Sequence, residues 1–340
     1  MFGISKEIRG KNISYRPELD GIRALSIVVV VLHHLGYLNG RGFLGVDIFF
    51  TLSGYLITQV LLATVVKGKP LLGFYRRRVA RLYPIMVLSI LIASLVVGFN
   101  STRDSKPVLA SIFYVKNFLH WGDLFGPFWS LSAEEQFYLL FPVTLLLFLK
   151  FFNKKILTFF LVVLSALIWS YVLWTNYPDY SWNQDGIFNL VIFRPTMILI
   201  GCIISLNYLA CVAVVKRFLF PFTLLFGGLV WACIGFQFPG LAGLSTALLI
   251  LLLDHEVALK SKLARGVRIF LSSWPLRTLG VLSYSIYIWH MPIIFLYFKN
   301  NLNPHSFTLE IFGYVLAIAI VSFYLIEVPV QRFLSGATSP

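Results

Sequence analysis

Long apolar runs recur along the whole 340-residue chain and constrain its fold more than any other feature. The composition agrees, because 58% of the residues are apolar and only 12% are charged, whereas about a quarter of the residues in soluble domains are charged. Ten runs are long enough, or nearly so, to cross a bilayer as helices. These runs are residues 24–39, 44–66, 82–99, 136–151, 156–175, 187–207, 218–236, 240–254, 276–298 and 308–328. The segment 108–133, which contains Trp121, is aromatic and less apolar and fits an interfacial position.

Basic residues mark the connections between these runs. If the N-terminus is cytoplasmic, 22 of the 28 Lys and Arg residues fall on the cytoplasmic side, as the positive-inside rule requires. The sequence therefore predicts an all-α polytopic membrane protein, with about ten transmembrane helices in one bundle, an internal substrate channel and both termini in the cytoplasm. We expect one domain over residues 1–340, with its core in 15–332 and no separate soluble domain.

The sequence gives no support to nucleic-acid binding or to a metal site. The net charge of +14 is divided among the connections between apolar runs, so it does not indicate nucleic-acid binding. Cys202, Cys211 and Cys233 lie inside apolar runs without the spacing of metal ligands, and we interpret them as buried thiols. We therefore predict no metal site.

A polar opening leads into the first apolar run, which ends on two histidines. Arg23 and His34 are eleven residues apart, so on a helix they share one face, roughly 16 Å apart along the axis. A neutral imidazole at that position can act as a general base. The alternative is an arginine that obeys the positive-inside rule and a histidine at the opposite interface.

The second run begins near the end of the first and contains Asp47. Because sequential spans joined by short connections are usually neighbours, Asp47 is a candidate to orient His34 as the carboxylate does in a catalytic triad. Ser53 and Gly54 follow on the same run, and close helix packing is their simplest role.

An arginine cluster precedes the third run. On a helix, Arg76, Arg77, Arg78 and Arg81 would present a cluster of guanidinium groups, because Arg81 is three residues from Arg78 and four from Arg77. Guanidinium groups bind phosphate in a bidentate manner. A topology signal in contact with lipid headgroups explains the same cluster.

Polar groups also gather at the start of the fourth run. Ser132 and Glu135 have the spacing of a capping box, which leaves Glu134, Gln136 and Tyr138 at the mouth of that helix.

The ninth run contains Ser283, Tyr284 and Tyr287, with His290 at mid-span. A buried histidine that bonds to a neighbouring helix is the commoner situation for His290. Arg194 and Glu327 are further ionisable groups within apolar runs, where such groups need a partner or a cavity.

Taken in order, these stretches resemble the acyltransferase-3 family of integral membrane acyltransferases. The resemblance covers nearly the whole chain. It rests on Arg23 and His34 with ten residues between them, on Gly45 to Gly54, on Arg77, Arg78 and Arg81, on Glu134, Gln136, Phe137 and Tyr138, and on Ser283, Tyr284, Tyr287, His290 and Pro292.

The resemblance implies an enzyme of the bacterial cytoplasmic (inner) membrane that transfers an acyl group and does not hydrolyse it. The donor would be acyl-CoA, with acetyl-CoA as the commonest case. The acceptor would be a hydroxyl of an extracytoplasmic or lipid-linked carbohydrate, such as an exopolysaccharide or lipopolysaccharide. Some relatives modify small hydrophobic products, so the acceptor stays open. Some carry a fused SGNH hydrolase-like domain, which we do not expect here because the sequence ends at Pro340.

The resemblance also suggests roles for the candidate residues. His34 would act as general base or as an acyl relay, oriented by Asp47 or Glu134. Arg23 and the arginine cluster would hold the phosphates of the donor. The groups for substrate or oxyanion contacts would be Ser53, Gln136, Tyr138, Tyr284 and His290.

Two other classes remain open at this stage. A transporter of glycans or organic anions would also contain buried ionisable residues, although we see no inverted repeat. A non-catalytic scaffold gives no reason for a deep histidine aligned with an arginine. The oligomeric state cannot be predicted from the sequence.

Overall fold

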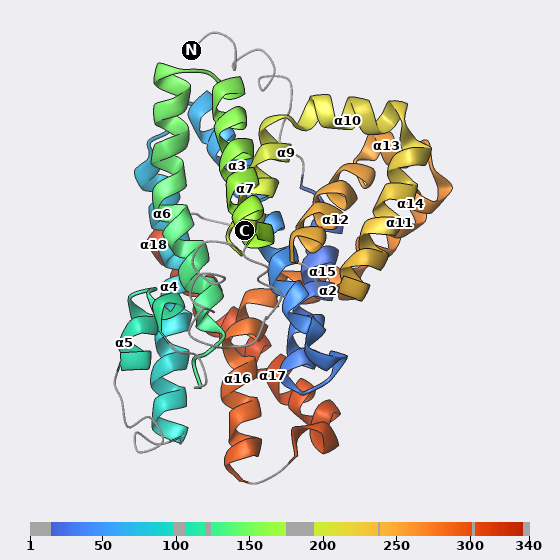
Figure 1. The fold of residues 1–340 in the computed structure, drawn as a ribbon. Helices are drawn as coiled ribbons and strands as arrows, with labels where there is room; N and C mark the ends of the chain where they lie inside the picture. The colour runs from blue at the N-terminus through green and yellow to red at the C-terminus, as the bar shows by residue number, and fades with distance from the viewer. Residues whose placement is uncertain are drawn as a thin grey trace.

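The computed structural model describes residues 15–97, 106–119, 124–174, 194–236, 239–300 and 303–335. Within these residues every regular element is a helix (Figure 1). The α-helices are α2 (Pro17–His34), α3 (Leu44–Val66), α4 (Leu71–Val97), α5 (Lys106–Ile112), α6 (Phe128–Phe151), α7 (Lys154–Trp174), α9 (Thr196–Leu206), α10 (Tyr208–Arg217), α11 (Leu219–Phe236), α12 (Pro239–Leu252), α13 (His255–Ala258), α14 (Lys262–Leu271), α15 (Trp274–Val281), α16 (Ser283–Lys299), α17 (Thr308–Ser322) and α18 (Val328–Ser335). The π-helical turn Phe323–Glu327 joins α17 to α18.

The described helices supply five to seven candidate membrane spans. Five are long and apolar enough on their own: Arg41–Val66, Leu71–Val96, Phe128–Phe151, Lys154–Trp174 and Thr308–Leu334. Two more result if each bent pair forms one span, namely α9 with α10, bent by 80°, and α15 with α16, bent by 67°. The prediction of a helical membrane protein is confirmed, whereas the count of ten spans is not.

Some predicted boundaries differ from the observed ones. The first predicted run starts at residue 24, but α2 begins at Pro17 and carries Glu18, Asp20 and Arg23, which lower its apolar character. The fourth run was expected from residue 136, but α6 begins at Phe128. Ser132 therefore lies inside the helix and donates to the Phe128 carbonyl, so the predicted capping box is wrong. Trp121 lies outside the described residues.

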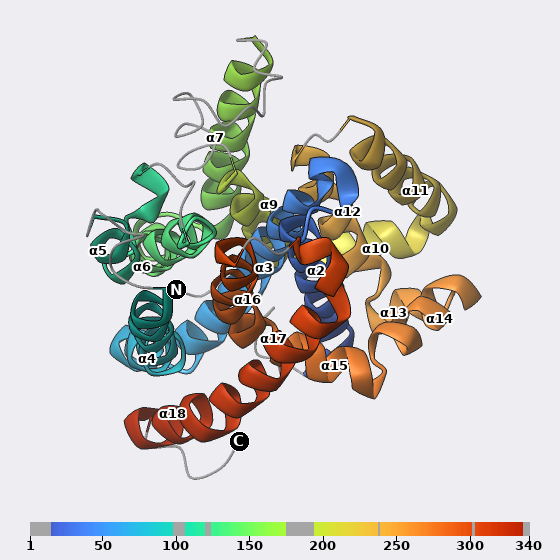
Figure 2. The ribbon, with the colours of Figure 1, turned by 90° about the horizontal axis from the view of Figure 1, so that it is seen from below.

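Helix α2 occupies the centre of the molecule when it is viewed from below (Figure 2). It contacts α3, α14, α15 and α16. At its first turn Arg16 joins three other helices through hydrogen bonds to Tyr55 on α3 (3.1 Å), Tyr208 on α10 (2.9 Å) and the Ile250 carbonyl on α12 (3.0 Å). Glu18, which is fully buried, pairs with Arg16 at 2.7 Å and compensates its charge. The helix that carries Arg23 and His34 is thus held on several sides.

Helices α3 and α9 meet through their backbones because glycine stands at both sides of the contact. A Cβ atom at Gly54 would lie 1.9 Å from the Ile198 carbonyl oxygen, and one at Gly201 would lie 2.0 Å from that of Thr51. Small residues permit this close approach of membrane helices. The packing role that the sequence suggested for Gly54 is therefore confirmed.

Replacing Gly201 with alanine is expected to destabilise the protein, because the methyl group must push α9 away from α3. Overpacking of this kind costs about 1–3 kcal/mol. Thermal denaturation of the detergent-solubilised protein measures the effect. Gly227→Ala is the matched control, since nothing lies within 4 Å of a Cβ at that position. Equal melting temperatures of the two variants would contradict the expectation.

Candidate active site

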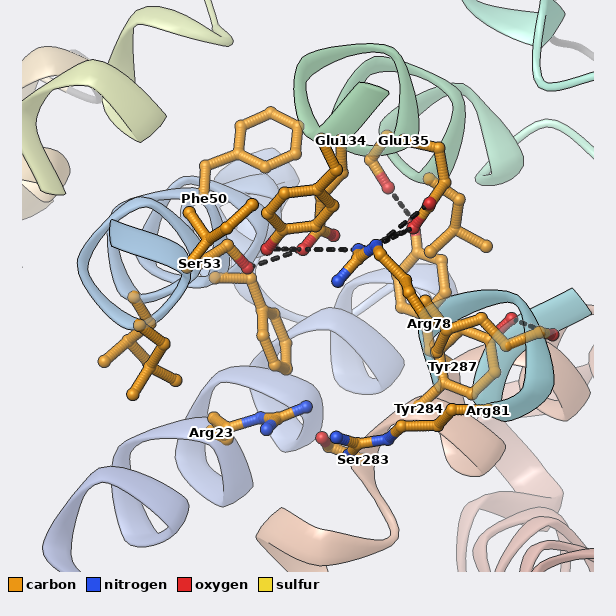
Figure 3. Close-up of a pocket in the computed structure, with 18 of the residues that line it drawn as sticks. Arg23, Phe50, Ser53, Arg78, Arg81, Glu134, Glu135, Ser283, Tyr284 and Tyr287 are labelled. Carbon is orange, nitrogen blue, oxygen red and sulfur yellow. Dashed lines mark hydrogen bonds and ion pairs between the residues drawn. The ribbon is translucent and has the colours of Figure 1, made fainter. Parts of the chain in front are cut away.

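A cavity of about 320 Å³ lies between α2, α3, α4, α6 and α16. The α3 residues that line it run from Val46 to Val60, which corresponds to roughly 21 Å along the helix axis. Sequence motifs that are far apart in the chain meet around this cavity (Figure 3). The predicted site residues that line it are Arg23, Ser53, Arg77, Arg78, Arg81, Glu134, Tyr138 and Tyr284.

Arg78 forms a dense ionic network with α6 on one side of the cavity. Its Nε lies 3.0 Å from both carboxylate oxygens of Glu135, and its Nη2 lies 2.5 Å from Oε1 of that residue. Glu134 lies 3.8 Å from the same Nη2 and accepts hydrogen bonds from Ser53 (2.6 Å) and Tyr138 (2.7 Å). The guanidinium also stacks on the Tyr138 ring, 3.2 Å from its centroid. The charge of Arg78 is therefore already compensated within the protein.

Replacing Arg78 with glutamine is expected to destabilise the fold, because two partly buried carboxylates would lose their cation. Removal of one partner from a buried pair costs about 3–5 kcal/mol. We expect about the lower end, since roughly a fifth of each side chain is exposed to solvent. The melting temperature in detergent measures the loss, and Arg77→Gln is the control because Arg77 lines the same cavity but is exposed. Equal melting temperatures for Arg78→Gln and Arg77→Gln would contradict a structural role of this network.

Arg23 and Arg81 face another part of the cavity together with Ser283 (Figure 3). Among the described residues, neither guanidinium has a carboxylate within ion-pair distance. The Ser283 hydroxyl is buried and has no hydrogen-bond partner there, and Ser283 is the first residue of α16. Helix N-termini favour anions. Two cations, a free hydroxyl and a helix N-terminus thus share one region in which no described carboxylate forms an ion pair, although Glu327 and Asp20 attract Arg81 at longer range.

His34, at the C-terminal end of α2, is within hydrogen-bond distance of His290 in the middle of α16. His34 Nδ1 lies 3.0 Å from the Val30 carbonyl oxygen and 3.2 Å from His290 Nε2. His290, which is fully buried, has its Nδ1 2.6 Å from the Tyr287 carbonyl oxygen. Because a carbonyl oxygen can only accept a hydrogen bond, Nδ1 carries the proton in both the His34 and the His290 ring. His290 Nε2 then accepts from His34, and the lone pair of His34 remains on Nε2.

The cavity and the histidine pair lie next to each other. Tyr287 lines the cavity, and its ring centroid is 5.3 Å from that of His290. Its hydroxyl donates to the Pro127 carbonyl (2.7 Å) and is bonded to Ser130 (2.7 Å). Tyr287 and Ser130 therefore form the wall between the arginine end of the site and the histidines.

Asp47 does not contact His34 as the sequence analysis expected. Arg194 Nη1 lies 3.4 Å from both carboxylate oxygens of Asp47, and both side chains are buried. The Arg194 guanidinium also lies 4.4 Å from the Phe43 ring centroid. A buried cation needs a counter-charge, and Asp47 supplies it. This pair confirms the expectation that Arg194 has a partner.

Comparison with known proteins identifies the relationship. The family model for the acyltransferase domain of type 3 matches residues 16–327, which is most of the chain. The chain belongs to the acyltransferase-3 family. Peptidoglycan O-acetyltransferase OatA of Listeria monocytogenes is 31% identical over 371 residues, which cover 94% of this chain and 56% of that protein. O-acetyltransferase OatA of Staphylococcus aureus is also 31% identical, with 94% and 57% covered. No solved structure matches this chain.

The chain spans little more than half the length of these two relatives. Within the acyltransferase-3 match lie all the residues that the sequence analysis selected. Arg76 is one of them, but it is exposed and does not line the cavity. Gln136 also lies outside the lining, where it bonds to Asn117 (2.9 Å) and to the Tyr114 carbonyl (2.7 Å). Outside the candidate spans, burial raises the pKa of Tyr114, and the nearby Glu135 raises it further.

Three residues that line this cavity were named in the sequence analysis without a role in the site: Glu135, Ser283 and Tyr287. Glu135 was assigned to a helix cap, whereas in the structure it forms an ion pair with Arg78. Ser283 and Tyr287 belong to the motif around His290, so the motif itself was the available signal. Their roles depend on which neighbours they meet, and a single sequence does not contain that information.

Proposed function

We propose that this chain is a membrane O-acyltransferase that transfers an acyl group, most simply acetyl, from cytoplasmic acyl-CoA to a hydroxyl of an extracytoplasmic or lipid-linked carbohydrate. The observation that carries this proposal is the region of Arg23, Arg81 and Ser283, where two guanidinium groups face the cavity without a direct ion pair among the described residues. Membership of the acyltransferase-3 family and the similarity to two O-acetyltransferases support it.

The phosphate groups of the donor supply the direct ion-pair partner of these two guanidinium groups. Two guanidinium groups close together in a medium of low dielectric constant repel each other, and a phosphate between them converts the repulsion into attraction. The Ser283 hydroxyl adds a neutral donor. Arg77 lines the cavity and is exposed, so it suits a second phosphate nearer the entrance. We assign Arg76 to the membrane surface and Arg78 to holding Glu134 and Glu135 in place.

The distance between the arginines and the histidines suits this donor. Arg23 and His34 lie roughly 16 Å apart along α2, and the extended pantetheine arm of CoA is long enough to carry the thioester over such a span. The thioester must pass Tyr287 and Ser130 to reach His34. The apolar lining between Val46 and Val60 provides a path that excludes water.

His34 acts as the general base in this proposal. Its Nε2 lone pair takes the proton of the acceptor hydroxyl while the oxygen attacks the thioester carbonyl. The carbon–sulfur bond breaks, and the thiolate leaves with the proton from Nε2. His290 accepts the hydrogen bond of His34 Nδ1 and stabilises the imidazolium, a role that a carboxylate has in a catalytic triad. In the relay form, Nε2 itself attacks the thioester and passes the acyl group to the acceptor.

Other donors for the developing oxyanion come from the cavity wall. Ser53 and Tyr138 donate to Glu134, and Tyr284 donates to the Leu82 carbonyl at 2.8 Å. These three hydroxyl groups could donate to the thioester only after their present hydrogen bonds are broken. We therefore assign them first to holding the wall of the cavity, and we regard substrate contacts as secondary.

We propose that the chain crosses the bacterial cytoplasmic membrane ten times, with both termini in the cytoplasm. The distribution of Lys and Arg supports this orientation. It places the start of α2 toward the cytoplasm and His34 toward the outside. The name of the Listeria relative favours peptidoglycan or its lipid-linked precursor as acceptor over other surface carbohydrates.

CoA release by the purified protein in nanodiscs tests the proposal. Acetyl-CoA and a lipid-linked glycan extract are supplied, and release is expected to require both His34 and the extract. Folded protein that releases no CoA with several acyl-CoA donors and glycan extracts would refute the acyltransferase proposal. Flux of glycan or organic anions without acyl-CoA would then support a transporter.

A further inference from the structure

We propose that α14 forms a binding surface for anionic phospholipid headgroups in the membrane leaflet nearest to the start of α2. The Lys and Arg distribution predicts that this leaflet is cytoplasmic. The surface consists of α14 and the adjoining cavity between α13 and α14. The inference requires that the protein sits in a bilayer but does not depend on the acyltransferase mechanism.

Helix α14 exposes apolar side chains and basic side chains. Leu263 and Phe270 lie on one side of the helix and are 66% and 60% exposed. Lys262 and Arg265, which are both exposed, lie on another part of its circumference together with Ile269, which is 66% exposed. A helix with an exposed apolar face and a basic polar face lies in the plane of the membrane interface. Trp274, which follows at the start of α15, is 75% exposed, and tryptophan favours the headgroup level.

The basic side of α14 borders a hollow of about 520 Å³. Its polar lining comes from His255, Arg265, Arg268, Ser272 and Ser273, and no acidic residue takes part in it. Guanidinium and hydroxyl groups are suitable donors for a phosphate diester.

The acidic residues near this surface already have partners, and Asp254, just before α13, accepts a hydrogen bond from Tyr208 at 2.6 Å. Glu256 on α13 binds Lys216 at 2.7 Å. Glu18 on α2 binds Arg16 at 2.7 Å and lies 3.7 Å from Arg268. The positive charge of Lys262 and Arg265 therefore remains available to an external anion.

The helix is fixed to the body of the protein, so the surface exists before any lipid binds. The Ser261 hydroxyl caps α14 by accepting from the Ala264 backbone N–H at 3.2 Å. At its other end the backbone of Leu271 lies against Gly21 of α2, where a Cβ atom would be 2.1 Å from the Leu271 carbonyl oxygen. Because Gly21 is in the second turn of α2, this contact places α14 at the end of α2 opposite His34.

A lipid headgroup fits this surface better than a soluble anion. An apolar side that accepts acyl chains and a basic side that accepts phosphate occur on the same helix, which corresponds to the two parts of a phospholipid. Each basic residue near an anionic membrane surface contributes an attraction equivalent to roughly fivefold in affinity.

Native mass spectrometry of the delipidated full-length protein with phosphatidylglycerol or phosphatidylcholine tests the inference. We expect the wild-type protein to bind phosphatidylglycerol more tightly, and the variant Lys262→Gln/Arg265→Gln to bind it roughly 30-fold more weakly. The matched control is Lys67→Gln/Lys69→Gln, which removes two exposed charges from the turn between α3 and α4. We expect it to bind phosphatidylglycerol like the wild type.

Three outcomes would overturn the inference. The α14 variant could keep the affinity of the wild type, or the control variant could lose as much affinity as the α14 variant. Glycerol 3-phosphate could bind as tightly as the lipid, which would identify a soluble anion as the ligand. Unchanged melting temperatures show that the variants are folded, because both exposed residues lie outside the protein core.

Discussion

Replacement of His34 with alanine is expected to lower kcat for CoA release by about 10²–10⁴-fold, the usual contribution of a general base. The Nε2 lone pair disappears, whereas the arginine region that would bind the donor is unchanged. The Kd for CoA should therefore remain close to that of the wild type. Stopped-flow detection of free thiol and calorimetric titration with CoA measure the two quantities.

His33→Ala is the matched control for this experiment. His33 is adjacent in sequence, and its ring centroid is 5.1 Å from that of His34, but its buried Nδ1 has no partner among the described residues. Normal transfer by a folded and inserted His34→Ala protein would refute the proposed mechanism. An equal loss in both variants would point to a packing effect.

The partner of His34 can be tested in the same assay. His290→Gln retains an oxygen that can accept from His34 Nδ1–H, whereas His290→Leu does not. We expect the glutamine variant to keep much more of kcat than the leucine variant. The Val30 carbonyl still holds the His34 proton on Nδ1 in both, so the difference should be smaller than the loss in His34→Ala. Equal activity of the two variants would exclude the proposed role of His290.

Replacement of Arg81 with methionine is expected to weaken CoA binding about 10- to 100-fold, because a charged hydrogen bond contributes about 1.5–3 kcal/mol. The ligand-free protein should keep its melting temperature, since Arg81 has no ion-pair partner among the described residues and faces Arg23. Calorimetric titration with CoA and thermal denaturation in detergent measure both effects.

A loss of affinity without a loss of stability is specific to a ligand contact. Arg76→Gln is the control, because Arg76 is exposed and does not line the cavity. It should change CoA affinity far less than Arg81→Met. Unchanged CoA affinity in Arg81→Met would remove this residue from the phosphate site, and an equal loss in Arg76→Gln would indicate a general effect of surface charge.

The membrane class and the alignment of Arg23 with the region of His34 could be predicted from the sequence. Both depend on local periodicity: apolar residues must cover a helix that faces lipid, and eleven residues make nearly a whole number of turns. The arginine cluster was recognised for the same reason, because its members lie within two turns of one helix. The predicted helix ends were less accurate, since α2 contains charged residues such as Glu18, which is buried and lies 3.7 Å from Arg268 of α14.

The partners of the charged and polar side chains were decided only by the tertiary structure. Arg78 meets Glu135 across 57 positions of sequence, Arg194 meets Asp47 across 147, and His290 meets His34 across 256. In a medium of low dielectric constant a buried charge or polar group is stabilised by a partner close in space, as Glu135 is for Arg78 and Asp47 is for Arg194. Which helix supplies that charge depends on packing contacts, such as Gly54 against Ile198, whose geometry is not local to any segment. The sequence by itself therefore determined which charged and polar residues lie on the apolar helices, and the packing of the helices determined how they are paired.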